Sequence, residues 1–305
     1  MDKKLNIGGQ AVIEGVMIRG RNHYVASVRK NNKIITKKAR IRQRKGKFYR
    51  LPVIRGFYNL VDMLLIGIRT LMWSADIASE EGEKITKKEI TFTIAFSFLL
   101  AMLFFVALPY FFTIIMGFKE ESSPFLFNFI DGILRIMIFL AYIIGISFLK
   151  DVRRLFQYHG AEHMAVHCYE NGKKLSVENI RKFPTLHPRC GTSFITIVLL
   201  ISILVFSVLP QIVLYSFPNF ANFNVFLRKI ILFFLRISFI PLIAGISYEL
   251  LKLSDKFKSG FLISILIQPG LWLQKITTKK PNKGQIEVAR KSVKELLNAE
   301  KAKNI

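Results

Sequence analysis

Acidic residues, histidine and cysteine are scarce in this chain of 305 residues. Against 45 Lys and Arg there are 20 Asp and Glu, so the formal net charge is +25 at pH 7. There are five His and two Cys. The first 16 residues also lack the basic start and apolar core of a cleavable signal peptide. We therefore expect no cleaved leader ahead of the apolar runs that follow.

Those long apolar runs set the fold class. Hydrophobic residues make up 51% of the chain, and 28 residues are Phe. Four runs are each longer than the about 20 residues that cross a bilayer. We expect a mainly α-helical, polytopic membrane protein with four transmembrane helices, at residues 90–116, 124–149, 193–217 and 225–250.

The distribution of basic residues predicts how these helices are oriented. Lys and Arg are in excess before the first run, within residues 150–191 and after residue 251, but not at residues 119–121 or 216–224. Such an excess is typical of cytoplasmic segments. We expect both termini and the long central loop to be cytoplasmic. Arg228 and Lys229 are exceptions, and their long side chains can reach an interface.

The apolar runs contain an internal similarity. Val106-Ala-Leu-Pro109 recurs as Ser207-Val-Leu-Pro210, and Leu134-Arg135-Ile136 recurs as Leu235-Arg236-Ile237, about one hundred residues later. We interpret this as two transmembrane hairpins of parallel orientation. Chance matching of apolar sequence is the alternative. Asp131, Arg135 and Arg236 fall inside the runs, where they neutralise one another or hold an anionic lipid or substrate group.

The remaining segments are shorter and basic. Residues 23–30 and 33–41 flank an Asn pair and predict a β-hairpin, and we expect a turn at Gly8-Gly9-Gln10. Residues 51–78 predict a helix on the membrane or under the bundle, residues 261–276 a re-entrant piece broken at Pro269-Gly270, and residues 286–297 an amphipathic helix. The predicted regions are a β-hairpin region (1–50), a juxtamembrane helix (51–89), hairpin 1 (90–149), a His/Cys loop (150–191), hairpin 2 (192–250) and an interfacial tail (251–305).

The His/Cys loop carries the chemistry. Four of the five His and both Cys lie within 32 residues, from His159 to Cys190. His159 and His163 are one helical turn apart and flank Glu162 in the order H-x-x-E-H. Two imidazoles at this spacing can share one Zn²⁺, and the carboxylate can act as general base toward water. We predict a zinc site, or a site for another divalent transition metal, with Glu162 as the catalytic residue.

The sequence alone does not determine the remaining metal ligands. The third ligand comes from His187, Cys190 or Glu249, and His167, Gln10 and Glu14 are additional candidates. Cys168 points to the opposite side of the same helix, so we expect it to pack in a core. In the reducing cytoplasm, thiols or metal ligands are favoured over a disulfide between the two Cys.

A histidine stripe on a juxtamembrane helix also has a plainer interpretation, as hydrogen-bonded polarity at an interface. A site filled by His159, His163, His187 and Cys190 would be closed and structural, whereas a catalytic site keeps one position for water. We favour catalysis because Glu162 has little reason to stand beside a purely structural metal.

Four motifs in order resemble those of the bacterial YqhQ family, from about Ile7 to the last helix. The resemblance implies an integral protein of the bacterial cytoplasmic membrane and a metal-dependent enzyme, without naming a substrate. H-x-x-E-H also resembles the inverzincin peptidases, but in that motif alone. The four motifs are Gly8-Gly-Gln-Ala-Val-Ile-Glu-Gly-Val-Met-Ile-Arg19, Tyr158-His-Gly-Ala-Glu-His163, His187-Pro-Arg-Cys-Gly-Thr-Ser-Phe194 and Pro269-Gly-Leu-Trp-Leu-Gln274.

The positive charge supports a second class of function. The basic segment 36–47 would be attracted to anionic lipid headgroups and equally to ribosomal RNA. It has few aromatic residues, so lipid contact is favoured and no specific nucleic-acid readout is expected. The two hypotheses are thus a membrane-bound metal-dependent hydrolase and a non-catalytic, metal-stabilised scaffold that docks lipid, a ribosome or a partner in membrane-protein biogenesis.

Overall fold

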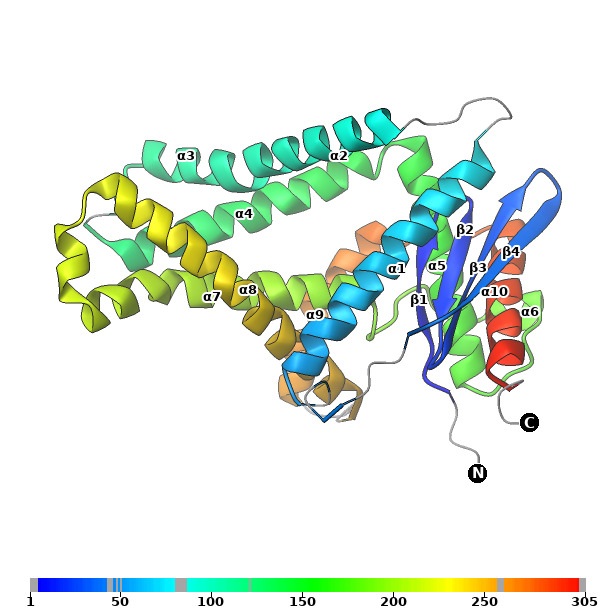
Figure 1. The fold of residues 1–305 in the computed structure, drawn as a ribbon. Helices are drawn as coiled ribbons and strands as arrows, with labels where there is room; N and C mark the ends of the chain where they lie inside the picture. Colours follow the sequence, from blue (N-terminus) through cyan, green and yellow to red (C-terminus); the bar gives the residue numbers. More distant parts are fainter. Residues whose placement is uncertain are drawn as a thin grey trace.

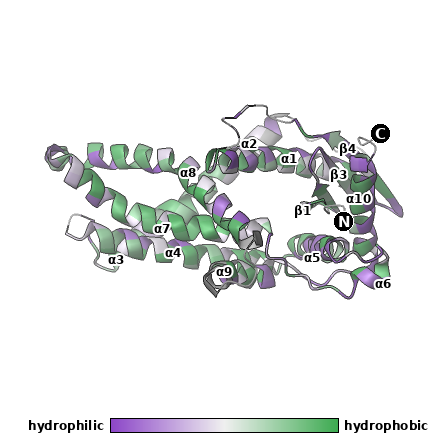
Figure 2. Ribbon diagram, turned by 90° about the horizontal axis from the view of Figure 1, so that it is seen from below, coloured by the Kyte–Doolittle hydropathy of each residue, from purple (hydrophilic) through white to green (hydrophobic). Residues whose placement is uncertain are grey.

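The computed structural model describes residues 5–42, 46–47, 49, 51–79, 87–120, 122–256 and 261–301. A small αβ module lies at one end of the molecule, and a bundle of long helices extends away from it (Figure 1). Apolar residues dominate α4, α7 and α8 in the bundle, whereas hydrophilic residues gather on the module (Figure 2). Arg44, in the predicted basic segment, lies outside the described residues.

The module is built on a four-stranded antiparallel sheet in the order β1-β2-β3-β4. The predicted hairpin is present as β3 and β4, and Asn31 in its turn has a φ of 51°. The turn predicted at Gly8-Gly9-Gln10 is wrong, because these residues belong to strand β1 and the turn follows at Ile13-Glu14. Gly15 is required at the sheet, because a Cβ would lie 2.2 Å from Ser27 O. The strands are β1 (Gly8–Val12), β2 (Gly15–Arg19), β3 (His23–Lys30) and β4 (Lys33–Arg40).

Helices cover both faces of the sheet (Figure 1). Because neighbouring strand residues point to opposite faces, Met17 packs toward α1 (Ile54–Ala78), while Val16 and Ile18 pack toward α5 (Lys150–Glu170) and α10 (Lys283–Lys301). The α1 helix therefore spans two environments. Its second half covers the sheet through Trp73, whereas Gly56 near its start approaches Tyr248 of α8.

The α10 helix is the predicted amphipathic helix. Its apolar face is fully buried, with Ile286, Ala289, Val293 and Leu296 each 0% exposed. At its end the Glu300 carboxylate accepts hydrogen bonds from the backbone N–H groups of the turn between β2 and β3. The C-terminal helix thus closes the module against the N-terminal sheet.

Four helices are long and apolar enough to cross a membrane, at Thr91–Ile115, Pro124–Ile146, Gly191–Ser216 and Val225–Leu253. They confirm that the four predicted apolar runs are long helices. The first combines three helical segments, and the turns that close the two hairpins lie at the end of the bundle far from the sheet (Figure 1). The bundle elements are α2 (Lys87–Met102), the π-helix η2 (Leu103–Ala107), α3 (Leu108–Ile115), α4 (Pro124–Ile146), α7 (Gly191–Ser216), the 3₁₀-helix η3 (Pro218–Asn222) and α8 (Val225–Lys256).

Two further helices complete the fold. The one-turn helix α6 (Val177–Ile180) follows α5 and contacts α5 and α10, and the longer helix α9 (Phe261–Thr277) packs against the start of α7. The predicted break at Pro269-Gly270 is wrong, because α9 continues through both residues. A Cβ on Gly270 would lie 2.5 Å from Ser193 Cα, so this glycine allows the two helices to approach closely.

Candidate metal centre at the junction of module and bundle

The α5 helix aligns the two His of the H-x-x-E-H motif. The rings of His159 and His163 are one turn apart, with their centroids separated by 4.4 Å. His163 is 2% exposed, and His159 is partly exposed. The helix can lie this deep because its neighbours Ala161 and Ala165 are fully buried in the core of the module.

Backbone carbonyls fix both rings. His159 Nδ1 lies 2.8 Å from Thr277 O, and His163 Nδ1 lies 2.5 Å from Thr185 O. A carbonyl only accepts, so each Nδ1 carries the proton and each neutral ring keeps its lone pair on Nε2. This is the arrangement in which metal-binding imidazoles are usually held. The two Nε2 atoms are therefore the available ligand atoms.

Cys190 completes the group. Its Sγ atom lies 3.1 Å from His159 Nε2, and the ligand atoms of His159, His163 and Cys190 all fall within 4.8 Å of one another. Cys190 is the N-cap of α7, where its sulfur accepts hydrogen bonds from the N–H and hydroxyl of Thr192. Cysteine sulfur is a common ligand of zinc, so Cys190 is the third candidate ligand of this group.

The electrostatics of His163 suit a ligand. Burial lowers the pKa of His163, and the positive charge of His159 lowers it further, although Cys190 acts in the opposite direction. The imidazole is therefore neutral at physiological pH. Its buried Nε2 atom makes no hydrogen bond of normal geometry to any described residue. Burying such an acceptor unpaired is costly, so the atom fits a bond to a metal.

Glu162 lies on the sheet side of the same helix. It is 4% exposed, and its carboxylate accepts a hydrogen bond from the backbone N–H of Gly9 in β1. Burial raises the pKa of Glu162, while His159 and His187 partly oppose this effect. Its Oε2 atom has no hydrogen-bond partner among the described residues. A carboxyl group with a raised pKa and a free oxygen suits the exchange of protons.

His167 and His187 belong to a second group, together with Glu170. The backbone N–H of Arg189 donates to His187 Nδ1, so His187 Nε2 carries the proton and faces Glu170 Oε2 at 3.3 Å. The Arg189 side chain forms an ion pair with the same carboxylate. Burial lowers the pKa of His167 to about 4. Both ring nitrogens of His187 therefore have partners in this second group or its loop, and the group of His159, His163 and Cys190 does not include His187.

The other candidate ligands are placed elsewhere. Glu249 forms an ion pair with Arg55 of α1, and neither group of ligand atoms includes it. Gln10 lies against Gly67 of α1, on the opposite face of the sheet from α5.

Glu14 and Cys168 also serve the packing of α5. The Glu14 carboxylate pairs with Arg154 and accepts a hydrogen bond from the Tyr158 hydroxyl, 3.2 Å away, so it holds α5 to the turn between β1 and β2. Cys168 is fully buried, and burial raises the pKa of its thiol. As expected from its side of the helix, Cys168 is part of the core of the module.

Gln274 of α9 is a residue that motif reasoning missed. Its side chain accepts from His187 N and donates to His187 O and Ser193 Oγ, at 2.8, 2.9 and 3.0 Å. It is fully buried and so clamps the loop that precedes Cys190. Its position in the Pro269–Gln274 motif was the available signal.

Comparisons with known proteins agree with one another. Residues 51–299 match the family model described as Protein of unknown function (DUF1385). The chain is 32% identical to the "Uncharacterized protein YqhQ" of Bacillus subtilis (strain 168), over 96% of this chain and 92% of that protein. No solved structure matches. The chain therefore belongs to the DUF1385 family, and its similarity to the YqhQ protein agrees with the resemblance of its motifs.

Proposed function

We propose that this protein is a membrane-bound, metal-dependent hydrolase with zinc, or another divalent transition metal, held by His159, His163 and Cys190. The observation that carries the proposal is the convergence of two imidazole Nε2 atoms and one thiol within 4.8 Å, with both Nδ1 atoms already fixed by carbonyls. Two nitrogens and one sulfur form a donor set that zinc prefers. Three protein ligands leave a fourth position free, as in catalytic zinc sites.

The residues around this centre have separable roles. When bound, zinc supplies a Lewis acid that polarises a carbonyl group and lowers the pKa of water. Glu162, buried and with one free oxygen, takes a proton from the attacking water and returns it to the leaving group. Partial exposure of His159 and Cys190 lets substrate approach. Because Cys190 caps the apolar helix α7, the substrate is one that meets the enzyme at the membrane surface.

The same proposal includes the topology. The module and both termini lie in the cytoplasm of a bacterial cell, because the basic segments are on the side of the module and the short hairpin turns are at the far end of the bundle (Figure 1). Two hairpins of parallel orientation, related by the sequence similarity around Arg135 and Arg236, fit this arrangement.

Metal analysis tests the proposal. Inductively coupled plasma mass spectrometry on the detergent-purified full chain should find about one zinc per wild-type chain. His163→Ala should lose it, whereas His23→Gln, which changes the one histidine outside residues 159–190, should keep it. Glu162→Gln should keep zinc and lose hydrolysis in a screen of lipid esters and peptides. No metal in chelator-free wild type would contradict the site, and joint loss of zinc and fold in Glu162→Gln would favour a structural metal.

A second candidate function is a metal-stabilised scaffold, and the observation that favours it is the edge strand β4. Lys33, Lys37, Lys38 and Arg40 are exposed along this strand. Such a basic edge attracts anionic lipid headgroups, a ribosome or a biogenesis partner. Neutralising these four residues should then abolish binding to anionic vesicles or ribosomes, and Glu162→Gln should have no effect. If the four-residue variant binds as wild type does, the scaffold function is wrong.

A further inference from the structure

A cavity of about 310 Å³ lies inside the helical bundle, between α4, α7 and α8. Its wall is largely apolar and includes Phe105 of the π-helix η2, whose wider turn interrupts the first span at this depth. π-Helical turns are frequent at functional sites. The volume lies at the lower end of the range of small-molecule sites in proteins.

Five polar residues line this otherwise apolar cavity: Asn128, Asp131, Arg135, Ser202 and Arg236. Arg135 pairs with Asp131 at 2.7 Å, and Arg236 donates to Asn128 Oδ1 at 2.6 Å. Arg135 and Arg236 are the two arginines of the sequence similarity between the hairpins, and both line this one cavity. With two arginines and one carboxylate, the formal charge of the group is one positive unit.

The hydrogen-bonding capacity of this group is not filled. Asp131 is 4% exposed, yet its Oδ1 atom has no partner in the described part of the chain. The Nε–H groups of Arg135 and Arg236 are also buried without an acceptor there. Unpaired charged groups at membrane depth are costly, and charged residues in spans usually mark a functional site.

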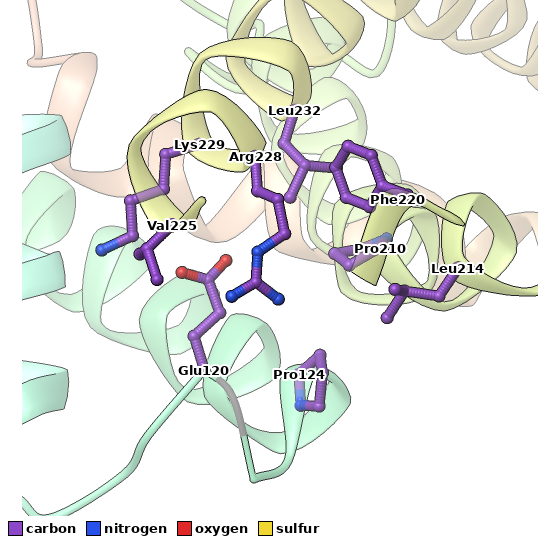
Figure 3. A pocket seen from close by; sticks show the side chains of 9 residues that line it. All are labelled: Glu120, Pro124, Pro210, Leu214, Phe220, Val225, Arg228, Lys229 and Leu232. Carbon is purple, nitrogen blue, oxygen red and sulfur yellow. The ribbon is translucent and has the colours of Figure 1, made fainter. Parts of the chain in front are cut away.

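Two other cavities among the described residues of the bundle differ in character. One, of about 460 Å³, is lined by apolar side chains with Ser216 and Asn219, and holds no charged group. The other is only about 80 Å³ and lies beside η3, where the Glu120 carboxylate points toward Arg228 (Figure 3). Only the central cavity among the three combines room for a ligand with excess positive charge.

We propose that the central cavity binds an amphiphile with a single negative charge, whose anionic group pairs with Arg236 and Arg135 and whose hydrocarbon chain lies along the apolar wall. One negative unit balances the charge of the polar group and supplies acceptors for the free Nε–H groups. The anionic group is a carboxylate or a phosphodiester, and its source is a free fatty acid or a phospholipid. The site does not depend on the metal centre, since none of its residues belongs to α5 or to the loop before α7.

Lipid retention by the full-length protein tests this inference. The delipidated protein in neutral detergent is titrated with oleate, phosphatidylglycerol or phosphatidylcholine, and native mass spectrometry reports the bound fraction. We expect the wild type to retain one molecule of oleate or phosphatidylglycerol in preference to phosphatidylcholine. Retention of oleate alone identifies the carboxylate, and retention of phosphatidylglycerol identifies the phosphodiester. Equal retention of all three, or of none, overturns the inference.

Two variants that change the charge of the cavity in opposite directions make the test specific. Arg236→Gln should weaken binding of the anionic ligand by about tenfold or more, because it removes a charge-assisted pair. Asp131→Asn should strengthen binding, since it removes the competing carboxylate. Arg228→Gln is the matched control, a loss of the same charge on the same helix but outside the cavity, and should bind as wild type does. If Arg236→Gln does not fold, Asp131→Asn decides, and unchanged or weaker binding in that variant refutes the site.

Discussion

Gly160, between His159 and His163, offers a sharp test of how the proposed metal ligands are held. A Cβ at this position would lie 2.2 Å from the carbonyl oxygen of Lys279, whereas ordinary contacts begin at 3.4 Å. The obstacle is backbone, so it cannot rotate away as a side chain would. In Gly160→Ala, α5 and the segment that follows α9 must therefore separate by about 1 Å.

The magnitude follows from the contacts at this crossing. The movement strains two hydrogen bonds, His159 Nδ1 to Thr277 O and Lys279 N to Phe156 O, each worth about 1 kcal/mol. Overpacking adds about 1–3 kcal/mol, and the better helix propensity of Ala returns about 1 kcal/mol. We expect a net destabilisation of about 2–4 kcal/mol. Because the partner of a ligand is displaced, zinc affinity should also fall about 10–100-fold.

Thermal unfolding in detergent and zinc competition with a chelator measure these two effects. Gly145→Ala is the matched control, since Gly145 is also helical but has nothing within 4 Å of its added Cβ. This control should be as stable as wild type or slightly more stable, with unchanged zinc affinity. If Gly160→Ala behaves like Gly145→Ala in both assays, the close crossing that fixes His159 is wrong.

Three further predictions address the surroundings of the centre. Gln274→Ala should leave buried backbone groups of His187 unpaired and so lower the free energy of unfolding by about 2–4 kcal/mol. The variant should also release zinc faster in stopped-flow chelation, and an unchanged release rate would contradict the role of Gln274 in holding this loop. Glu249→Gln should have a lower melting temperature, because Glu249 pairs with Arg55, but should keep its zinc in metal analysis. Loss of zinc in this variant would indicate that Glu249 is a ligand. Burial raises the pKa of Glu300, but hydrogen bonds from the turn between β2 and β3 outweigh it and hold that pKa below its usual value of 4.5. A carboxylate with a lowered folded-state pKa stabilises above its unfolded pKa and loses that contribution as the pH falls through its folded pKa. Wild type should therefore lose more stability than Glu300→Gln below about pH 4.5. An equal fall of the melting temperature with pH in the two proteins would exclude this role.

The four apolar helices and the β3–β4 hairpin could be predicted because each depends on residues that are close together in the sequence. A run of apolar residues must be helical in a bilayer, and the Asn31 position tolerates the positive φ that its turn requires. The H-x-x-E-H spacing likewise predicts two rings on one helical face. Such features depend on near neighbours, so the sequence contains enough information to place them.

The contacts between distant segments could not be predicted in this way. Thr277 and Thr185 hold the two His rings through backbone carbonyls, which every residue possesses and which leave no mark in the sequence. Gly8-Gly9-Gln10 looked like a turn because glycine is common in turns, whereas Gly9 is needed where β1 lies close to the Met17 carbonyl oxygen of β2. Selecting Cys190 over Glu249 as the partner of the two His also required knowing where α7 and α8 lie relative to α5.

The central claim is that two imidazole nitrogens and the Cys190 sulfur bind one metal ion. Extended X-ray absorption fine structure at the zinc edge, on the detergent-purified full chain, tests it most directly. We expect one sulfur at about 2.3 Å and two nitrogens at about 2.0–2.1 Å, with the remaining shell filled by a light atom. The sulfur shell should vanish in Cys190→Ser and persist in Cys168→Ser. A shell of nitrogen and oxygen alone in the wild type, or a spectrum that Cys190→Ser leaves unchanged, would contradict the centre.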